Sequence, residues 1–195
     1  QLIDLQSSPP IAVCLMVVPE HMDWHSDMQE YTTAKQQIFE HQSSDNVAIY
    51  YAGNSVSTDI ATASPGKKLP YYAPPGAYID NDAIVIDGQT ICRTDELKLL
   101  GKHNWQNVCA AVTTVWHITQ DLAAIKTAAT NFSGLPFRIE FRTEKSGVRY
   151  YNDSFAATPD ACIAAIDSIP EQKVMIVGGF DRDLDIAHLV AKLTD

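Results

Sequence analysis

Ile11-Ala-Val-Cys-Leu-Met-Val-Val18 is a continuous apolar run, rich in β-branched residues, near the start of the chain. Such a run is typical of a strand that is buried on both faces of a sheet. Ser26 or Asp27 is suited to cap a helix that extends to about His41, and the residues at 46–51 predict the next strand. Strand, helix and strand with short connections form a βαβ unit. We therefore expect an α/β fold with a parallel sheet.

Beyond this unit the sequence alternates between loop, strand and helix patterns. Residues 53–66 are rich in Ser, Thr, Gly and Asn and predict a loop. The further predicted elements are short antiparallel strands at 77–80, 83–86 and 90–92, helices at 104–118 and 122–131, a hairpin of 138–142 with 148–152, a helix at 159–168, a buried strand at 173–179 and a last helix from Asp185. The break Phe132-Ser-Gly-Leu-Pro136 predicts a boundary between domains of residues 1–132 and 133–195.

The composition excludes several classes of protein. The chain has 195 residues, of which 46% are hydrophobic and 19% are charged, as in an ordinary globular protein. Its 14 Lys and Arg against 24 Asp and Glu give a formal net charge of −10. This balance disfavours a nucleic-acid or anionic-membrane partner, because nothing offsets phosphate repulsion at long range. It is compatible with a local pocket for one phosphorylated small molecule.

The cysteines and the chain start bear on the setting of the protein. The four cysteines never form a Cys-x-x-Cys pair, so we expect reduced thiols in the cytoplasm rather than a zinc site. The longest apolar run, residues 11–18, is too short to span a bilayer. The chain begins at Gln1 without Met and enters strand-like sequence at once, and we expect it to be a piece of a longer protein.

His21 and Lys35 are the first candidates for chemistry. His21 follows the carboxyl end of the first predicted strand, where α/β sheets place their ligand crevice. Lys35 lies four positions after Tyr31, so both side chains lie on one helix face. This places Lys35 near the buried stripe that we expect this helix to form from Met28, Tyr31, Ile38 and Phe39. A buried ammonium is costly unless it is neutralised, paired or modified. Spacing alone favours the plainer alternative, a turn histidine and a lysine that reaches solvent.

Further candidates lie in the second half of the chain. Asn104 and Asn107 are three positions apart at a helix start and suit a planar ring with a donor and an acceptor, although Asn104 equally suits a helix cap. Arg138 lies at the predicted domain junction, where an arginine suits a phosphate. Asn152-Asp153-Ser154 ends one predicted strand. Gly178-Gly-Phe-Asp-Arg182 ends another, and its glycines permit close approach of a ligand.

Six stretches, taken in order, resemble the Mur ligase family. They are Pro19-Glu-His-Met-Asp-Trp-His25, Glu30-Tyr-Thr-Thr-Ala-Lys35, Leu100-Gly-Lys-His-Asn-Trp-Gln-Asn107, Ser133-Gly-Leu-Pro-Phe-Arg-Ile-Glu140, Gly147-Val-Arg-Tyr-Tyr-Asn-Asp-Ser154 and Gly178-Gly-Phe-Asp-Arg182. They cover nearly the whole chain at separations similar to those of the family. Within the family they are most similar to the ligases that add D-glutamate.

The resemblance implies a fold and an activity. The fold is α/β: the later part of a P-loop-type central ATPase domain, with a mixed sheet and helices, followed by the first part of a Rossmann-like C-terminal domain. The activity is that of an ATP-dependent, ADP-forming ligase of peptidoglycan precursor synthesis, which joins D-glutamate to UDP-N-acetylmuramoyl-L-alanine through an acyl phosphate. The resemblance further implies Mg²⁺, a cytoplasmic monomer, and no nucleic-acid or membrane partner. The family's triphosphate loop lies outside the matched stretches, so we expect this chain alone to be inactive.

The resemblance also implies a role for each candidate residue. Lys35 matches the lysine that these enzymes carbamylate, which turns a costly buried cation into an anion that binds Mg²⁺ together with His21. Both residues are therefore catalytic candidates. The other implied contacts are adenine at Asn104 and Asn107, phosphates at Arg138, ribose at Asp153, and the amino-acid substrate at Ser154 and Arg182.

Four positions depart from the family pattern. Phe155 stands where a lysine near the reacting carboxylates is common, and Ala157 stands where a threonine contacts glutamate. Phe137 replaces a usual histidine, and Arg182 a usual lysine, although Arg and Lys are not interchangeable. These departures leave two alternatives open: a sibling ligase with another amino acid or acceptor, and a degenerate ligase-like domain that binds without chemistry.

Overall fold

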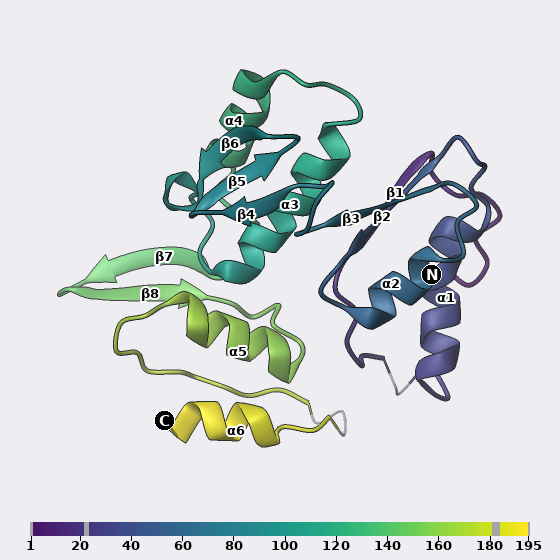
Figure 1. The fold of residues 1–195 in the computed structure, drawn as a ribbon. Helices are drawn as coiled ribbons and strands as arrows, with labels where there is room; N and C mark the ends of the chain where they lie inside the picture. Colours follow the sequence, from purple (N-terminus) through teal and green to yellow (C-terminus); the bar gives the residue numbers. More distant parts are fainter. Residues whose placement is uncertain (1, 22–23, 181–183, 195) are drawn as a thin grey trace. The chain divides into compact units, whose positions relative to one another are not determined.

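The computed structural model describes residues 2–21, 24–180 and 184–194, and the chain forms two compact units. The first unit comprises residues 1–96 and 105–130, and the second comprises residues 97–104 and 131–195. Helices and strands are interspersed along the chain, and the strands form one parallel and two antiparallel sheets in the described residues (Figure 1). The α/β class predicted from the sequence is therefore confirmed.

The first unit begins with a parallel sheet in the order β1-β2-β3. Its strands are β1 (Ile11–Cys14), β2 (Val47–Tyr51) and β3 (Lys67–Tyr71), and α1 (Met28–Glu40) connects the first two. Ala12 lies opposite Ala48, and Cys14 lies opposite Tyr50. The predicted βαβ unit is confirmed.

Two helices cover one face of this sheet. Phe39 of α1 and Ile60 of α2 (Ser55–Ala61) are fully buried in a cluster with Ala12, Cys14 and Ala48. The apolar stripe predicted for α1 is also found, because Tyr31 is buried and Met28 and Ile38 pack against the same cluster. The cluster is the main core beneath the candidate site.

Two predictions for this sheet need correction. The first strand ends at Cys14 rather than at residue 18, and Leu15 and Met16 are about half exposed. The predicted loop at 53–66 contains α2, which Asn54 caps by accepting a hydrogen bond from the Ser57 N–H. A strong cap and tertiary burial outweigh the weak helix propensity of its Ser and Thr residues.

The rest of the first unit follows the sequence pattern closely. Strands β4 (Tyr78–Asp80), β5 (Ala83–Ile86) and β6 (Gln89–Arg93) form an antiparallel sheet. The joining pairs Asn81-Asp82 and Asp87-Gly88 have positive φ angles, as tight two-residue hairpins require. A short 3₁₀ turn follows, and then helices α3 (Lys102–Val115) and α4 (Leu122–Asn131), of which residues 102–104 and 131 are counted with the second unit.

The second unit holds a two-stranded hairpin and two helices. They are β7 (Glu140–Lys145), β8 (Val148–Asn152), α5 (Pro159–Ser168) and α6 (Ala187–Thr194). The strand predicted at 173–179 is wrong: this segment has no regular structure and is largely exposed. A strand needs a neighbour for its backbone groups, and in the described residues of this unit β7 and β8 pair only with each other. No helix in the described part of the chain has the length and hydropathy of a membrane span.

Candidate functional site

The first turn of α1 fixes how the helix presents Lys35. The Asp27 carboxylate accepts a hydrogen bond from the Glu30 N–H at 2.8 Å, and the Glu30 carboxylate accepts from the Ser26 N–H and hydroxyl at 2.7 and 2.9 Å. These hydrogen bonds from Ser26 lower the pKa of Glu30. The reciprocal bonding is similar to a capping box, and it sets the helix so that Tyr31 is buried while Lys35, one turn later, is half-buried.

His21 lies in the segment that leads from β1 to α1. Its backbone has a φ of 59°, in the left-handed region, and its carbonyl oxygen accepts hydrogen bonds from the N–H groups of Trp24 and His25 at 3.0 and 2.9 Å. Its Nε2 lies 3.6 Å from Oε1 of Glu20, and its side chain is 54% exposed. The chain therefore turns at His21 and leaves the imidazole accessible.

The ring of Tyr31 brings His21 and Lys35 together. Nζ of Lys35 lies 4.6 Å from the centroid of this ring, within the range of a cation–π contact. The His21 ring meets the same ring edge-on, with centroids 6.3 Å apart. Burial raises the pKa of the nearby Cys14 thiol, and a hydrogen bond with Ser57 and the charge of Lys35 oppose this rise. Two residues chosen from the sequence thus share one aromatic platform.

His25, which was not among the candidates from the sequence, belongs to the same aromatic cluster. Its ring centroid lies 5.3 Å from that of Tyr31, and its Nδ1 lies 4.0 Å from Oε1 of Glu30. This Nδ1 is buried and has no hydrogen-bond partner among the described residues. The spacing of His25 and Tyr31, six residues apart across a helix start, gave no periodic signal for this contact.

The residues around Tyr31 supply an incomplete set of metal ligands. Within residues 2–21, 24–180 and 184–194, no group of three or more His, Cys, Asp or Glu side chains is arranged to hold a metal ion. The imidazole of His21 is a possible ligand, whereas the ammonium of Lys35 has no free lone pair. A magnesium ion prefers oxygen ligands, so the described side chains fit it only in part.

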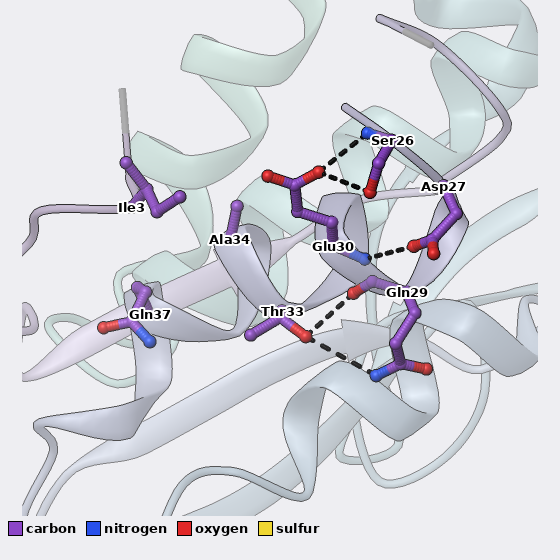
Figure 2. Close-up of a pocket in the computed structure, with 8 residues that line it drawn as sticks. All are labelled: Ile3, Ser26, Asp27, Gln29, Glu30, Thr33, Ala34 and Gln37. Atoms are coloured by element: carbon purple, nitrogen blue, oxygen red, sulfur yellow. Dashed lines mark hydrogen bonds between the residues drawn. The ribbon is translucent and has the colours of Figure 1, made fainter. Parts of the chain in front are cut away.

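A separate pocket of about 330 Å³ lies along α1, at its first turns (Figure 2). It is lined by Ile3, Ser26, Asp27, Gln29, Glu30, Thr33, Ala34 and Gln37. Most of its polar groups are engaged within the helix start, where Ser26 bonds to Glu30 and Thr33 bonds to Gln29. Lys35 and His21 do not line this pocket.

Asn104 and Asn107 lie in the first two turns of α3. The helix begins at Lys102, two residues before the predicted start, so Asn104 is inside the helix and is not its cap. The Asn104 amide donates a hydrogen bond to the Leu100 carbonyl at 2.7 Å, which ties it to the segment just before the helix. Asn107 is exposed.

Arg138 and Asp153 each connect the two loops that flank the β7–β8 hairpin in the second unit. Nη1 of Arg138 donates to the Phe155 carbonyl at 2.7 Å, and its guanidinium lies 5.6 Å from the centre of the Phe155 ring. Oδ1 of Asp153 accepts a hydrogen bond from the Ile139 N–H at 2.9 Å. Burial lowers the pKa of His103, and the nearby Asp153 carboxylate opposes this shift. The loops before β7 and after β8 thus form one cluster.

The two phenylalanines that depart from the family pattern contact each other. The rings of Phe137 and Phe155 have centroids 5.2 Å apart, and the Phe155 N–H donates to the Phe137 carbonyl. The sequence alone did not indicate that these two substituted positions are in contact, because they are 18 residues apart. Ser154 is exposed beside them, and its N–H donates to the Asn152 side chain at 3.0 Å. Arg182 lies outside the described residues.

The fold and the ordered residues identify the class of protein. The Mur ligase middle domain matches residues 1–115, more than half of the chain, and the chain therefore belongs to the Mur ligase family. It is 34% identical over 188 residues to a UDP-N-acetylmuramoylalanine--D-glutamate ligase of Clostridium kluyveri. A ligase of the same name from Clostridium botulinum is also 34% identical, over 193 residues. The alignments include 94% and 97% of this chain but only 41% and 42% of those proteins.

Solved structures of sibling enzymes have the same fold. MurF from Acinetobacter baumannii aligns with a TM-score of 0.73 at 19% identity, over 85% of this chain and 38% of MurF. MurC from Thermotoga maritima aligns with a TM-score of 0.59 at 17% identity, over 83% of this chain and 38% of MurC. At such identities the likeness concerns the fold alone.

Proposed function

We propose that this chain is part of an ATP-dependent, ADP-forming ligase that joins D-glutamate to UDP-N-acetylmuramoyl-L-alanine in peptidoglycan precursor synthesis. The identity of about 34% to ligases of that name, over nearly the whole chain, supports the substrates. The observation that carries the catalytic part is the approach of His21 and Lys35 to the single ring of Tyr31. The imidazole of His21 and the amine of Lys35, 14 positions apart in the sequence, thus lie at the same tyrosine ring.

The proposed reaction brings anions together, so positive charge and positioning dominate. ATP activates the acceptor carboxylate as an acyl phosphate, and the amine of D-glutamate then attacks the acyl carbon and expels phosphate. We assign the nucleotide contacts to Asn104, Asn107, Arg138 and Asp153, and the D-glutamate contacts to Ser154 and Arg182. When bound, Mg²⁺ supplies positive charge that offsets the repulsion between phosphates and carboxylates.

Lys35 is proposed to act as a carbamate. Its neutral amine adds to the carbon of CO₂, a C–N bond forms, and a proton is released. The ammonium lies over the negative face of the Tyr31 ring, and a carbamate, being anionic, is repelled from that face. The modified side chain would therefore turn from the ring face, and its oxygens, together with the imidazole of His21, would hold Mg²⁺.

We propose a cytoplasmic monomer with domains divided between residues 132 and 133. The relatives are more than twice as long as the aligned segment, so we propose that the activity belongs to a longer protein.

An assay of the parent ligase tests the function. Release of phosphate from ATP that depends on both UDP-N-acetylmuramoyl-L-alanine and D-glutamate is expected. Release only with another amino acid or acceptor would assign a sibling ligase, and release with none would favour a binding domain without chemistry.

The carbamate has its own test. After incubation with ¹³C-labelled bicarbonate, a carbamate carbon signal is expected in the NMR spectrum of the wild type and not in that of Lys35→Ala. Lys98→Ala, which removes an exposed lysine, is the control and should retain the signal.

A further inference from the structure

The end of β1 is held by the side chain of a serine from α2. The Ser57 hydroxyl, fully buried, donates a hydrogen bond to the Cys14 carbonyl at 3.0 Å and accepts one from the Tyr51 N–H at 3.0 Å. Cys14 and Tyr51 are the last residues of β1 and β2. The hydroxyl therefore bridges the two strand ends where their direct pairing stops.

Asn54 continues this attachment one step further along the chain. Its Oδ1 accepts hydrogen bonds from the Ser57 N–H at 2.8 Å and from the Val17 N–H at 3.3 Å, and its Nδ2 donates to the Val17 carbonyl at 3.2 Å. Capping α2 requires only the bond from Ser57. The two hydrogen bonds with the Val17 backbone attach the segment between β1 and α1 to the start of α2.

Within the part of the chain that the structure describes, that segment makes few other hydrogen bonds, and its other anchor is the packing of the Val17 side chain in the core cluster. Val17 is 5% exposed, whereas Leu15 and Met16 are about half exposed. Between Leu15 and Glu20, the hydrogen bonds made with the described residues are the two with Asn54 and a long contact of 3.5 Å from Cys14 Sγ to the Leu15 carbonyl. His21 follows Val17 by four residues and then turns toward Tyr31.

We propose that Asn54 is a positioning residue that fixes residues 15–21 and, through Val17, places His21 beside Tyr31. The role in catalysis rests on the proposed function, because it requires that His21 acts in the ligase. The structural part does not depend on any substrate. Asn54 was not among the candidates from the sequence, since it lay in a predicted loop of similar polar residues.

Two substitutions separate the bonds to Val17 from the cap of α2. Asn54→Asp keeps the size and the capping oxygen, but a carboxylate oxygen then faces the Val17 carbonyl, and two acceptors repel each other. Asn54→Ser is also a good cap and is too short to reach Val17. Thr58→Ala is the matched control, because the Thr58 hydroxyl donates to the Asn54 carbonyl at 3.1 Å and makes no hydrogen bond with the described residues of the segment.

Hydrogen exchange of the 195-residue chain tests the placement. The N–H groups of Trp24 and His25 donate to the His21 carbonyl, so they report on this turn. In both Asn54 variants we expect these amides to exchange about tenfold faster while the amides of β2 keep their protection. Thr58→Ala should match the wild type. Unchanged exchange at Trp24 and His25 in folded Asn54→Asp would overturn the proposal.

Kinetics of the parent ligase test the catalytic consequence. Asn54→Asp should lower kcat about tenfold or more, with the KM for D-glutamate unchanged within about twofold. If Asn54 acts through His21, the double variant with His21→Ala should be no slower than His21→Ala alone. Additive losses would refute this coupling. A wild type without ligase activity would remove the proposed function, and the exchange experiment would still decide the placement of His21.

Discussion

The segments Ile11–Cys14 and 174–177 are both apolar and contain β-branched residues, but only the first forms a buried strand. The first is a strand whose Ala12 and Cys14 are 3% and 7% exposed, whereas Val174 and Ile176 are 94% and 99% exposed. The first segment pairs with β2 and is covered by α1 and α2. The second finds no such neighbour among the described residues of its unit. An apolar, β-branched run thus favours a strand, but the strand forms only where a neighbouring strand pairs with its backbone groups.

The largest effect is expected when the same truncation is made in both regions. Ile49→Ala in β2 removes a fully buried side chain and should lower the free energy of unfolding by about 2–5 kcal/mol. Ile176→Ala removes an exposed one and should change it by less than about 0.5 kcal/mol. Urea titration followed by circular dichroism measures both values.

Equal losses for the two isoleucines would contradict the comparison. A loss above about 2 kcal/mol for Ile176→Ala would mean that residues 174–177 are buried in solution as the sequence pattern predicts.

The next effect concerns how β1 ends. Ser57→Ala leaves the Cys14 carbonyl and the Tyr51 N–H without their shared partner in a buried place, and should cost about 1–3 kcal/mol. Ser55→Ala, on the exposed side of the same helix, is the control and should stay within about 0.5 kcal/mol of the wild type. Thermal melts of the two variants and the wild type compare these effects. Similar melting of both variants would show that the bridge contributes little.

Local patterns predicted the elements whose stability is local. The βαβ unit, the antiparallel hairpins with their left-handed turn residues, and α5 with Thr158 as its cap followed from periodicity and turn chemistry. α2 and β3 were missed, because one is stabilised by burial and a distant cap and the other by pairing with β2. The strand at 173–179 was predicted wrongly because its pattern contains no information on neighbours.

The third effect is a fall in the free energy of unfolding at alkaline pH, caused by a buried thiol in the first unit. Burial, aided by Cys92, raises the pKa of the Cys109 thiol from 9.0 to about 12. Between these values the unfolded chain releases the proton while the folded chain keeps it. The stabilisation is complete below about pH 9 and is lost as pH rises, by on the order of 1 kcal/mol per pH unit.

The alkaline dependence is measured by urea titrations at several pH values. Cys109→Ala should flatten the slope between pH 9 and 12 relative to the wild type. Cys162→Ala, at a position that is only partly buried, should flatten it less. A slope unaffected by Cys109→Ala would show that this thiol ionises as easily in the folded state as in the unfolded chain.

The smallest effect is a fall in stability at acid pH, caused by a partly buried histidine in the second unit. Burial lowers the pKa of His103, so the unfolded chain binds a proton more readily than the folded one. Its contribution to stability is present above the ordinary pKa of 6.5 and is lost as pH falls below that value. His103→Gln should reduce the acid sensitivity of melting, whereas His188→Gln, at an exposed position, should leave it unchanged. The reverse order would contradict the assignment.

The candidate site was only partly readable from the sequence. Lys35 and Tyr31 share a helix face, so their contact followed from a spacing of four residues. The contacts of His21, His25 and Asn54 depend on the path of a segment without regular structure, which no periodicity describes. The pairing of Phe137 with Phe155 joins positions 18 residues apart across a hairpin.

The turn at His21 also gives the protein an optical reporter of its own. The backbone N–H of Trp24 donates to the His21 carbonyl, so this tryptophan belongs to the turn. Its side chain is 82% exposed, whereas those of Trp105 and Trp116 are half-buried. A collisional quencher such as iodide should therefore reach Trp24 first. The quenched part of the fluorescence would follow this turn in real time, without a label, as ligands are added.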